Sequence, residues 1–272
     1  MSLAVNVPGP VVAARLMKHG ASVVKIEPPE GDPLFHHAPD WYARLTDSQS
    51  ILRLDLKTRE GKSALDRRLA RADLVITANR PSTLKRLGLD FPSLHARFPR
   101  LCQLQIGGYP PPHDDLPGHD LSFQAAAGLV VEPPRMPFTV LADLAGAQSA
   151  ATEAVLMLLH RQRTGEATCA RVFLAEAAES LAPGPALRLC GVDGPLGGDQ
   201  PGYAIYPTKD GFIALAALEP RFLTRLKEAL AIPAASAARL RKIFREKTSA
   251  RWEAWGRRRG IPVTAIRRRS GR

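Results

Sequence analysis

Short β-branched runs alternate with helically spaced apolar positions in the first half of the chain. Residues 8–18 and 58–69 have helical spacing, whereas residues 23–26, 74–78 and 101–106 are short apolar runs of the strand type. Strands separated by helices are typical of a parallel sheet with helices packed against it. The pattern therefore predicts an α/β fold.

The middle of the chain contains a loop and two helical patterns. Residues 107–118 are rich in glycine and proline and predict a loop, and residues 120–129 then have the spacing of a helix. A longer helix rich in alanine and leucine is expected at 145–161. Asp143 precedes it at the place of an N-cap, which is an ordinary structural reason for an aspartate there.

The last part of the chain has a different pattern. Residues 203–207 and 212–218 flank an Asp-Gly turn, which predicts a β-hairpin, and helical patterns follow at 220–231 and 237–255. We therefore expect four segments. They are a large α/β domain at 1–190, a glycine-rich linker at 191–202, a small α+β domain at 203–266 and a basic tail at 267–272.

The charge of the chain is concentrated near its end. The net charge is +12, and residues 239–272 hold 13 Lys and Arg against 2 Glu, so the rest of the chain is close to neutral. A local basic segment without a recognisable nucleic-acid motif favours a solvated helix face over nucleic-acid binding. Binding of a polyanion by this segment stays open as an alternative.

The cysteines and the apolar runs bear on the cellular compartment. Cys102, Cys169 and Cys190 are odd in number and widely spaced, which argues against both a disulfide framework and a zinc site and fits a reducing cytoplasm. No apolar stretch approaches the roughly 20 residues of a membrane span, and the N-terminus lacks the pattern of a secretory signal. We expect a cytoplasmic protein without a membrane helix.

Two residues stand out as candidates for proton transfer. His119 begins a helix after the Gly/Pro loop, where α/β folds place ligands, although an ordinary loop histidine would look the same. Asp143 lies in an apolar sequence context, which would desolvate its carboxyl group and raise its pKa. A histidine beside such an aspartate would form an acid/base pair. Glu219, before Pro220, reads by itself as an acidic residue at a helix start.

Several common site motifs are missing. The sequence contains no GxGxxG, no P-loop motif and no GxSxG nucleophile elbow. No cluster of histidine, cysteine and carboxylate residues has the spacing of metal ligands. We therefore predict no metal site and no dinucleotide site.

A series of short segments, in order, resembles the family III CoA-transferases and, within them, the α-methylacyl-CoA racemases. The matching segments are residues 20–33, 54–57, 79–81, 86–89, 118–120, 142–143, 163–165, 217–220 and 262–264. The resemblance implies a Rossmann-like CoA-binding domain and a small domain that closes the acyl site. It implies no metal or redox cofactor, with coenzyme A entering only as part of the acyl-CoA substrate.

The resemblance also assigns roles to individual residues. His119 and Asp143 would act on opposite faces of the substrate, and Glu219 would hold the histidine. The residues expected to bind CoA are Leu54, Asp55, Leu56, Lys57, Asn79, Arg86, Gly118, Asp120, Leu121, Ser122 and Phe123.

Three functions follow from these assignments. The first is an acyl-CoA racemase, an isomerase that inverts the α-carbon of a 2-methylacyl-CoA through an enolate. The alternative is a CoA-transferase in which Asp143 attacks the thioester and forms an acyl anhydride. The second alternative is an inactive family member with a polyanion-binding tail.

The sequence departs from the family pattern at three places. The opening strand is expected to be missing or reduced to a stub before Val5, and Pro28 stands where racemases often carry arginine. The chain ends soon after Thr264, whereas family members continue back into the large domain. We therefore expect a fold truncated at both ends and an ordinary homodimer rather than a ring-interlocked one.

Overall fold

The computed structural model describes residues 1–182, 189–191, 194 and 196–267, and its chain divides into two compact units. The first unit is Met1–Gly184 and the second is Pro185–Arg272. The predicted limits at 190, 202 and 266 stay predictions, and the linker and the basic tail lie partly outside the described residues. Each unit is described by itself.

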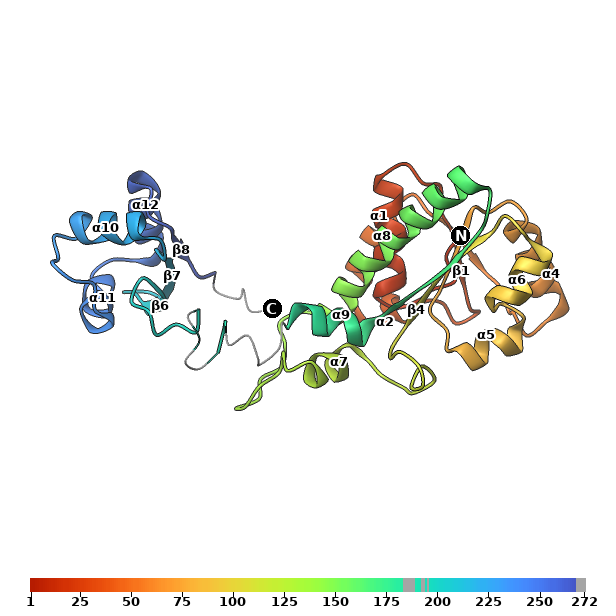
Figure 1. Ribbon diagram of the computed structural model, residues 1–272, viewed down its shortest axis with the longest axis horizontal. Coiled ribbons are helices and arrows are strands. Elements are labelled where there is room, and N and C mark those ends of the chain that lie inside the picture. Colours follow the sequence, from red (N-terminus) through yellow and green to blue (C-terminus); the bar gives the residue numbers. More distant parts are fainter. Residues whose placement is uncertain (183–188, 192–193, 195, 268–272) are drawn as a thin grey trace. The chain divides into compact units, whose positions relative to one another are not determined.

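The first unit contains parallel strands, as the alternating pattern predicted. They are β1 (Val24–Glu27), β2 (Ser50–Arg53), β3 (Leu74–Thr77), β4 (Cys102–Gly107) and β5 (Cys169–Phe173). β1 pairs with β2, and β3, β4 and β5 lie side by side in that order (Figure 1). Since parallel strands end at the same edge of a sheet, the residues that follow β3, β4 and β5 come together.

The expected stub of an opening strand joins these two groups of strands. The Ser2 N–H donates to the Val24 carbonyl at 2.9 Å, and the Leu3 N–H donates to the Ile76 carbonyl at 2.8 Å. The stub ends before Asn6, whose φ of 68° leaves the extended conformation. Residues 1–3 thus stand between β1 and β3.

Helices cover both faces of this sheet because its strands alternate their apolar side chains. Leu74 and Ile76 pack on one face with α1 (Pro8–Lys18) and α8 (Leu141–Thr164), whereas Val75 packs on the other. That other face is covered by α4 (Arg59–Leu69), α5 (Pro81–Leu87) and α6 (Phe91–Arg97). The remaining helices of the unit are α2 (Pro33–His37), α3 (Pro39–Thr46), α7 (Asp120–Ala126) and α9 (Leu174–Leu181). The α/β prediction is confirmed.

The start of α8 corrects one expectation. The helix begins at Leu141, four residues before the expected start at Ala145, so Asp143 lies inside the first turn and is not the N-cap. Val140 occupies the cap position without a side-chain hydrogen bond. The Asp143 N–H is instead bound by the Asp120 Oδ1 at 3.1 Å, so a residue of α7 caps α8. The Asp120 carboxylate thus takes the place of a side-chain N-cap at Val140.

The second unit is an antiparallel sheet with helices. β6 (Tyr203–Pro207) and β7 (Phe212–Ala216) form the predicted hairpin, and β8 (Val263–Ala265) pairs with β7. The helices are α10 (Pro220–Ala229), α11 (Ala237–Phe244) and α12 (Ser249–Arg259).

The single helix expected at 237–255 is wrong. The chain breaks between α11 and α12, where the Thr248 hydroxyl accepts the Arg251 N–H at 3.4 Å as an N-cap. The break lets Phe244 and Trp252 pack edge to face in the core of the unit, with ring centroids 5.0 Å apart.

Within the described residues, no helix is both long enough and apolar enough to cross a membrane.

Candidate active site

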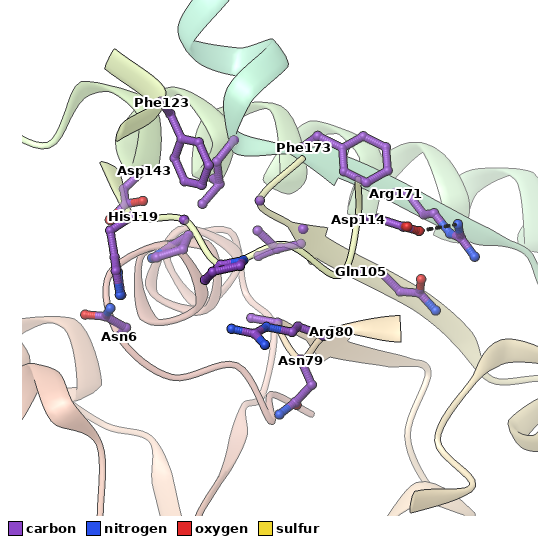
Figure 2. Close-up of a pocket in the computed structure, with 18 of the residues that line it drawn as sticks. Asn6, Asn79, Arg80, Gln105, Asp114, His119, Phe123, Asp143, Arg171 and Phe173 are labelled. Atoms are coloured by element: carbon purple, nitrogen blue, oxygen red, sulfur yellow. Dashed lines mark ion pairs between the residues drawn. The ribbon is translucent and has the colours of Figure 1, made fainter. Parts of the chain in front are cut away.

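A pocket of about 310 Å³ opens at the carboxyl edge of the parallel strands (Figure 2). Its walls come from the chain after the N-terminal stub and after β3, and from the ends of β4 and β5 with the loop that precedes α7. α/β folds bind their ligands at this edge. The polar residues that line it are Asn6, Asn79, Arg80, Gln105, Asp114, His119, Asp143 and Arg171.

Asp143 is the buried carboxyl group of this pocket. Its residue is 7 % exposed, and its helix brings it to the wall next to the loop that carries His119. Burial, followed by the negative charge of Asp120, raises the pKa of Asp143 to about 7. The apolar sequence context around Asp143 predicted this rise in its pKa. Near neutral pH the pocket therefore contains both the protonated and the ionised carboxyl group.

Asp120 is a positioning residue rather than part of the pocket wall. Its Oδ1 accepts the Asp143 N–H, and its Oδ2 accepts the Gln124 Nε2 at 2.6 Å. The same Nε2 of Gln124, which is buried, donates to the Thr139 carbonyl at 3.0 Å. These contacts tie α7 to the beginning of α8 and so fix the place of Asp143.

His119 lies on the same side of the pocket as Asp143 (Figure 2). It is the N-cap residue of α7, and its extended backbone, with φ −137°, turns the chain from the loop into the helix. The Ser122 Oγ accepts the His119 N–H at 3.0 Å and donates to the His119 carbonyl at 2.7 Å. Ser122 therefore supports the backbone of the histidine.

Phe123 forms the inner wall beside these two residues. Its ring is 1 % exposed and meets the Tyr109 ring edge to face, with centroids 5.0 Å apart. A Cβ at Gly118 would lie 2.6 Å from the Phe123 Cε1, and one at Gly108 would lie 3.1 Å from the Phe123 Cζ. The loop can approach the ring this closely at position 118 only with glycine.

The pocket gathers some of the residues predicted from the sequence and not others. It is lined by Asn79, Gly118, His119, Phe123 and Asp143. The other predicted residues of the first unit do not line it, namely Leu54, Asp55, Leu56, Lys57, Arg86, Asp120, Leu121 and Ser122. Glu219 is the N-cap residue of α10 in the second unit. Its contact with His119 and all roles in CoA binding stay predictions.

Some of the residues outside this pocket have other surroundings. Leu56 lines a second hollow between α4 and the α5–α6 segment, together with Leu87 and Arg97. The Asp55 Oδ1 accepts the Lys57 N–H at 2.9 Å, which shapes the turn before α4.

Sequence reasoning missed Asn6, Arg80, Gln105, Asp114 and Arg171. Gln105 and Arg171 belong to strands, Arg80 lies three residues after the end of β3, and Asp114 lies in the predicted loop. Their positions near strand ends were a signal that could have found them.

Asn6 is held at the pocket by a buried charged cluster. Its N–H donates to the Asp32 Oδ1 at 2.8 Å, and the Asp32 Oδ2 lies 2.6 Å from the Lys25 Nζ. Glu27 binds the same Nζ at 2.8 Å, and all three charged side chains are at most 2 % exposed. Pairing of these charges offsets the cost of burying them.

The described residues contain no group of three or more His, Cys, Asp or Glu side chains that could hold a metal ion.

Comparison with known proteins identifies the family. The family model described as CoA-transferase family III matches residues 1–271. The chain is 29% identical over 248 residues to the succinyl-CoA–D-citramalate CoA-transferase of Chloroflexus aurantiacus, covering 83% of this chain and 62% of that protein. It is 30% identical over 238 residues to the succinate–glutarate CoA-transferase of Agrobacterium fabrum, covering 76% of this chain and 59% of that protein. The chain thus spans less than two thirds of the length of these relatives.

Solved structures have the same fold. A hypothetical protein of Mycobacterium tuberculosis (Rv3272) superposes with a TM-score of 0.84 at 25% identity, covering 98% of this chain and 82% of that one. A CAIB/BAIF family protein from Brucella suis superposes with a TM-score of 0.82 at 24% identity, with 98% and 82% covered, and shows the fold alone.

Proposed function

Because the chain belongs to the family III CoA-transferases, we propose that it transfers CoA between two carboxylic acids with the Asp143 carboxylate as nucleophile. The observation that carries the proposal is the burial of this carboxyl group in the wall of the pocket at the carboxyl edge of the strands. The two named relatives are CoA-transferases, which supports this alternative better than the racemase prediction.

The environment of Asp143 suits nucleophilic attack. Because its pKa is about 7, the Asp143 carboxylate is a stronger base than an ordinary aspartate. A large fraction of the Asp143 side chains is still ionised at neutral pH. The Asp143 N–H bond to Asp120 fixes the backbone from which the side chain reaches the pocket. Little reorganisation is then needed before attack.

The reaction proceeds by four substitutions at carbonyl carbon. The Asp143 carboxylate attacks the thioester, which expels CoA thiolate and leaves an acyl–aspartyl anhydride. The thiolate attacks the aspartyl carbonyl, so the first carboxylate leaves and Asp143 becomes a CoA thioester. The acceptor carboxylate attacks that thioester, and the released thiolate then attacks the acceptor carbonyl. The products are the new acyl-CoA and a free Asp143 carboxylate.

His119 supports a second candidate function. His119 and Asp143 line the same pocket, so two groups able to exchange a proton lie within one site (Figure 2). Uptake of deuterium at the α-carbon of a 2-methylacyl-CoA in heavy water, lost in both His119→Ala and Asp143→Asn, would support the racemase. Absence of exchange in a protein that transfers CoA would exclude it.

Trapping with hydroxylamine tests the main proposal. Incubation with an acyl-CoA donor and hydroxylamine should convert Asp143 to its hydroxamate, detected by peptide mass spectrometry, because the anhydride and the aspartyl-CoA thioester both present an activated aspartyl carbonyl to hydroxylamine. Asp143→Asn should abolish the adduct. Asp114→Asn, which changes another carboxyl group of the same pocket, should leave it. A modified peptide that lacks Asp143, or transfer that survives Asp143→Asn, would contradict the proposal.

The remaining expectations are part of the same proposal. We propose a homodimer that uses acyl-CoA without a metal or redox cofactor. A cytoplasmic location is supported by three cysteines that are all unpaired in the structure.

A further inference from the structure

Arg171 lies at the other side of the pocket from Asp143. Figure 2 shows Asp143 and His119 together on one side, and Arg171, Asp114 and Gln105 on the opposite side. Arg171 and Gln105 are paired in register on the neighbouring strands β5 and β4. Paired residues of a parallel ladder point to the same face, so the guanidinium and the amide are neighbours.

Both side chains have hydrogen-bond donors to spare. Within the described residues, Arg171 has one ionic partner, Asp114, with 4.0 Å between Nη1 and Oδ2, which is too long for a hydrogen bond. Gln105 is 9 % exposed, and no partner within the described residues binds its side-chain amide. A guanidinium carries five N–H donors and an amide two. The side of the pocket farthest from Asp143 therefore offers a cluster of unused donors.

The surroundings favour an anion at these donors. The same pocket is also lined by the apolar residues Ile106, Phe173 and Leu174, which lie one to three positions further along the chain than Gln105 or Arg171. Gln105 is nearly buried, whereas the Arg171 side chain is 49% exposed, so a ligand can reach the guanidinium. A planar guanidinium matches a carboxylate with two parallel charge-assisted hydrogen bonds. A purely apolar group would displace water from these donors without replacing its hydrogen bonds.

We propose that this enzyme selects dicarboxylic acyl groups, and that Arg171 with Gln105 binds the distal carboxylate while Asp143 attacks the thioester carbonyl. The proposal rests on the proposed function, since it places the reacting carbonyl at Asp143. Arg171 is then a specificity-determining residue, and the weak pair with Asp114 holds its guanidinium ready in the absence of substrate.

A phosphate of CoA is the other anion that Arg171 could meet. The diphosphate of CoA is separated from the thioester sulfur by the whole pantetheine arm, whereas the second carboxylate of a short dicarboxylic acid lies a few bonds from the carbonyl. A pocket of about 310 Å³ is at the small end of ligand sites and fits an acyl group rather than the whole thioester. The geometry therefore favours the carboxylate.

Binding of two matched thioesters tests the proposal without needing turnover. Glutaryl-CoA and pentanoyl-CoA have acyl chains of equal length and differ in a distal carboxylate against a methyl group. Their Kd values would be measured by calorimetry in the full chain carrying Asp143→Asn, in which no anhydride can form. We expect glutaryl-CoA to bind at least about ten-fold more tightly, since a hydrogen-bonded charge pair contributes that much. Adding Arg171→Gln should remove the preference for glutaryl-CoA. The Kd of pentanoyl-CoA should change by no more than about two-fold.

Companion variants separate the possible roles of Arg171. Arg163→Gln removes the same charge from the exposed end of α8 and should keep the preference. Arg171→Lys should restore part of it, because the charge returns without the paired donors. Asp114→Asn frees Arg171 from its carboxylate partner and should keep or increase the preference.

Each contrary outcome overturns the proposal. Equal weakening of both thioesters by Arg171→Gln would assign the residue to a CoA phosphate. No change in either Kd would reduce it to a structural partner of Asp114, and lack of preference in the starting protein would exclude a distal-carboxylate site. Failure of hydroxylamine trapping would instead reject the nucleophile while leaving these binding results standing.

Discussion

At the scale of single residues, burial of the Asp143 carboxyl group destabilises the folded state when that group is ionised. Its pKa is about 7 in the folded chain, against an ordinary value of 3.8. The folded state therefore holds the proton more tightly than the unfolded state between these two values. The contribution of the Asp143 carboxyl group to the free energy of unfolding is fully present below about pH 4 and is lost as the pH rises through 7.

Asp143→Asn should therefore stabilise the protein at alkaline pH while it removes activity. We expect the free energy of unfolding to rise by roughly 2–4 kcal/mol at pH 8, because a neutral amide avoids the cost of the buried charge. Urea titration of wild type and variant at pH 8 and at pH 4 checks this. The difference should be close to zero at pH 4, and an equal difference at both pH values would refute the explanation.

Gly118 is a second residue whose identity follows from close contact. Gly118→Ala places its methyl carbon 2.6–2.7 Å from ring atoms of Phe123. We expect a loss of about 1–3 kcal/mol in stability and a drop in activity, because the ring must leave its buried position. Thermal unfolding and transfer rates measure both effects. Combining the change with Phe123→Leu, which makes room, should recover part of the loss, and a further additive loss would count against a steric cause.

At the scale of elements, the contact between α7 and α8 sets the surroundings of the Asp143 carboxyl group. Asp120→Asn keeps an Oδ1 acceptor for the Asp143 N–H but removes the charge that helps to raise the pKa of Asp143. Acylation of Asp143 should increase with pH to a midpoint near 7 in the wild type, because only the carboxylate attacks. The variant should show a lower midpoint.

Single-turnover formation of the acyl intermediate at a series of pH values measures this midpoint. Glu176→Gln on α9 removes an acidic charge elsewhere in the same unit and should leave the midpoint in place. If Asp120→Asn changes only the maximum rate and not the midpoint, Asp120 holds Asp143 in place but does not affect its pKa.

The start of α8 shows why local patterns misplace such elements. Asp143 is a good N-cap residue by type, and the apolar spacing begins two residues after it. The helix extends further because Asp120, 23 positions away in sequence, binds its first turn. No window of neighbouring residues contains that information.

At the scale of the whole molecule, each unit has a core of its own. The core of the second unit is built around Tyr206, Phe244 and Trp252, whereas the cores of the first lie on the two faces of its sheet. Phe244→Ala should therefore destabilise the second unit by about 3–5 kcal/mol through loss of packing. Hydrogen exchange by mass spectrometry should show faster exchange in residues 203–265 and unchanged exchange in β3 and β4. Acceleration across both units would show that they unfold together.

The amino-acid sequence by itself determined most of the elements and indicated two residues that line the same pocket. Local spacing and β-branched runs were sufficient for α1, β3 and the β6–β7 hairpin, because these elements bury faces that their own residues define. The loop before α7 and the apolar context of Asp143 pointed to His119 and Asp143, which share one pocket.

Only the tertiary structure decided which other groups meet them. Parallel pairing brings Arg80, Gln105 and Arg171 to one edge, although 91 positions separate the first from the last. The same assembly buries Asp143 and puts the charge of Asp120 beside it, which raises its pKa. The physical reason is that burial, charge proximity and strand pairing depend on distances in space, which residue types and local spacing do not encode.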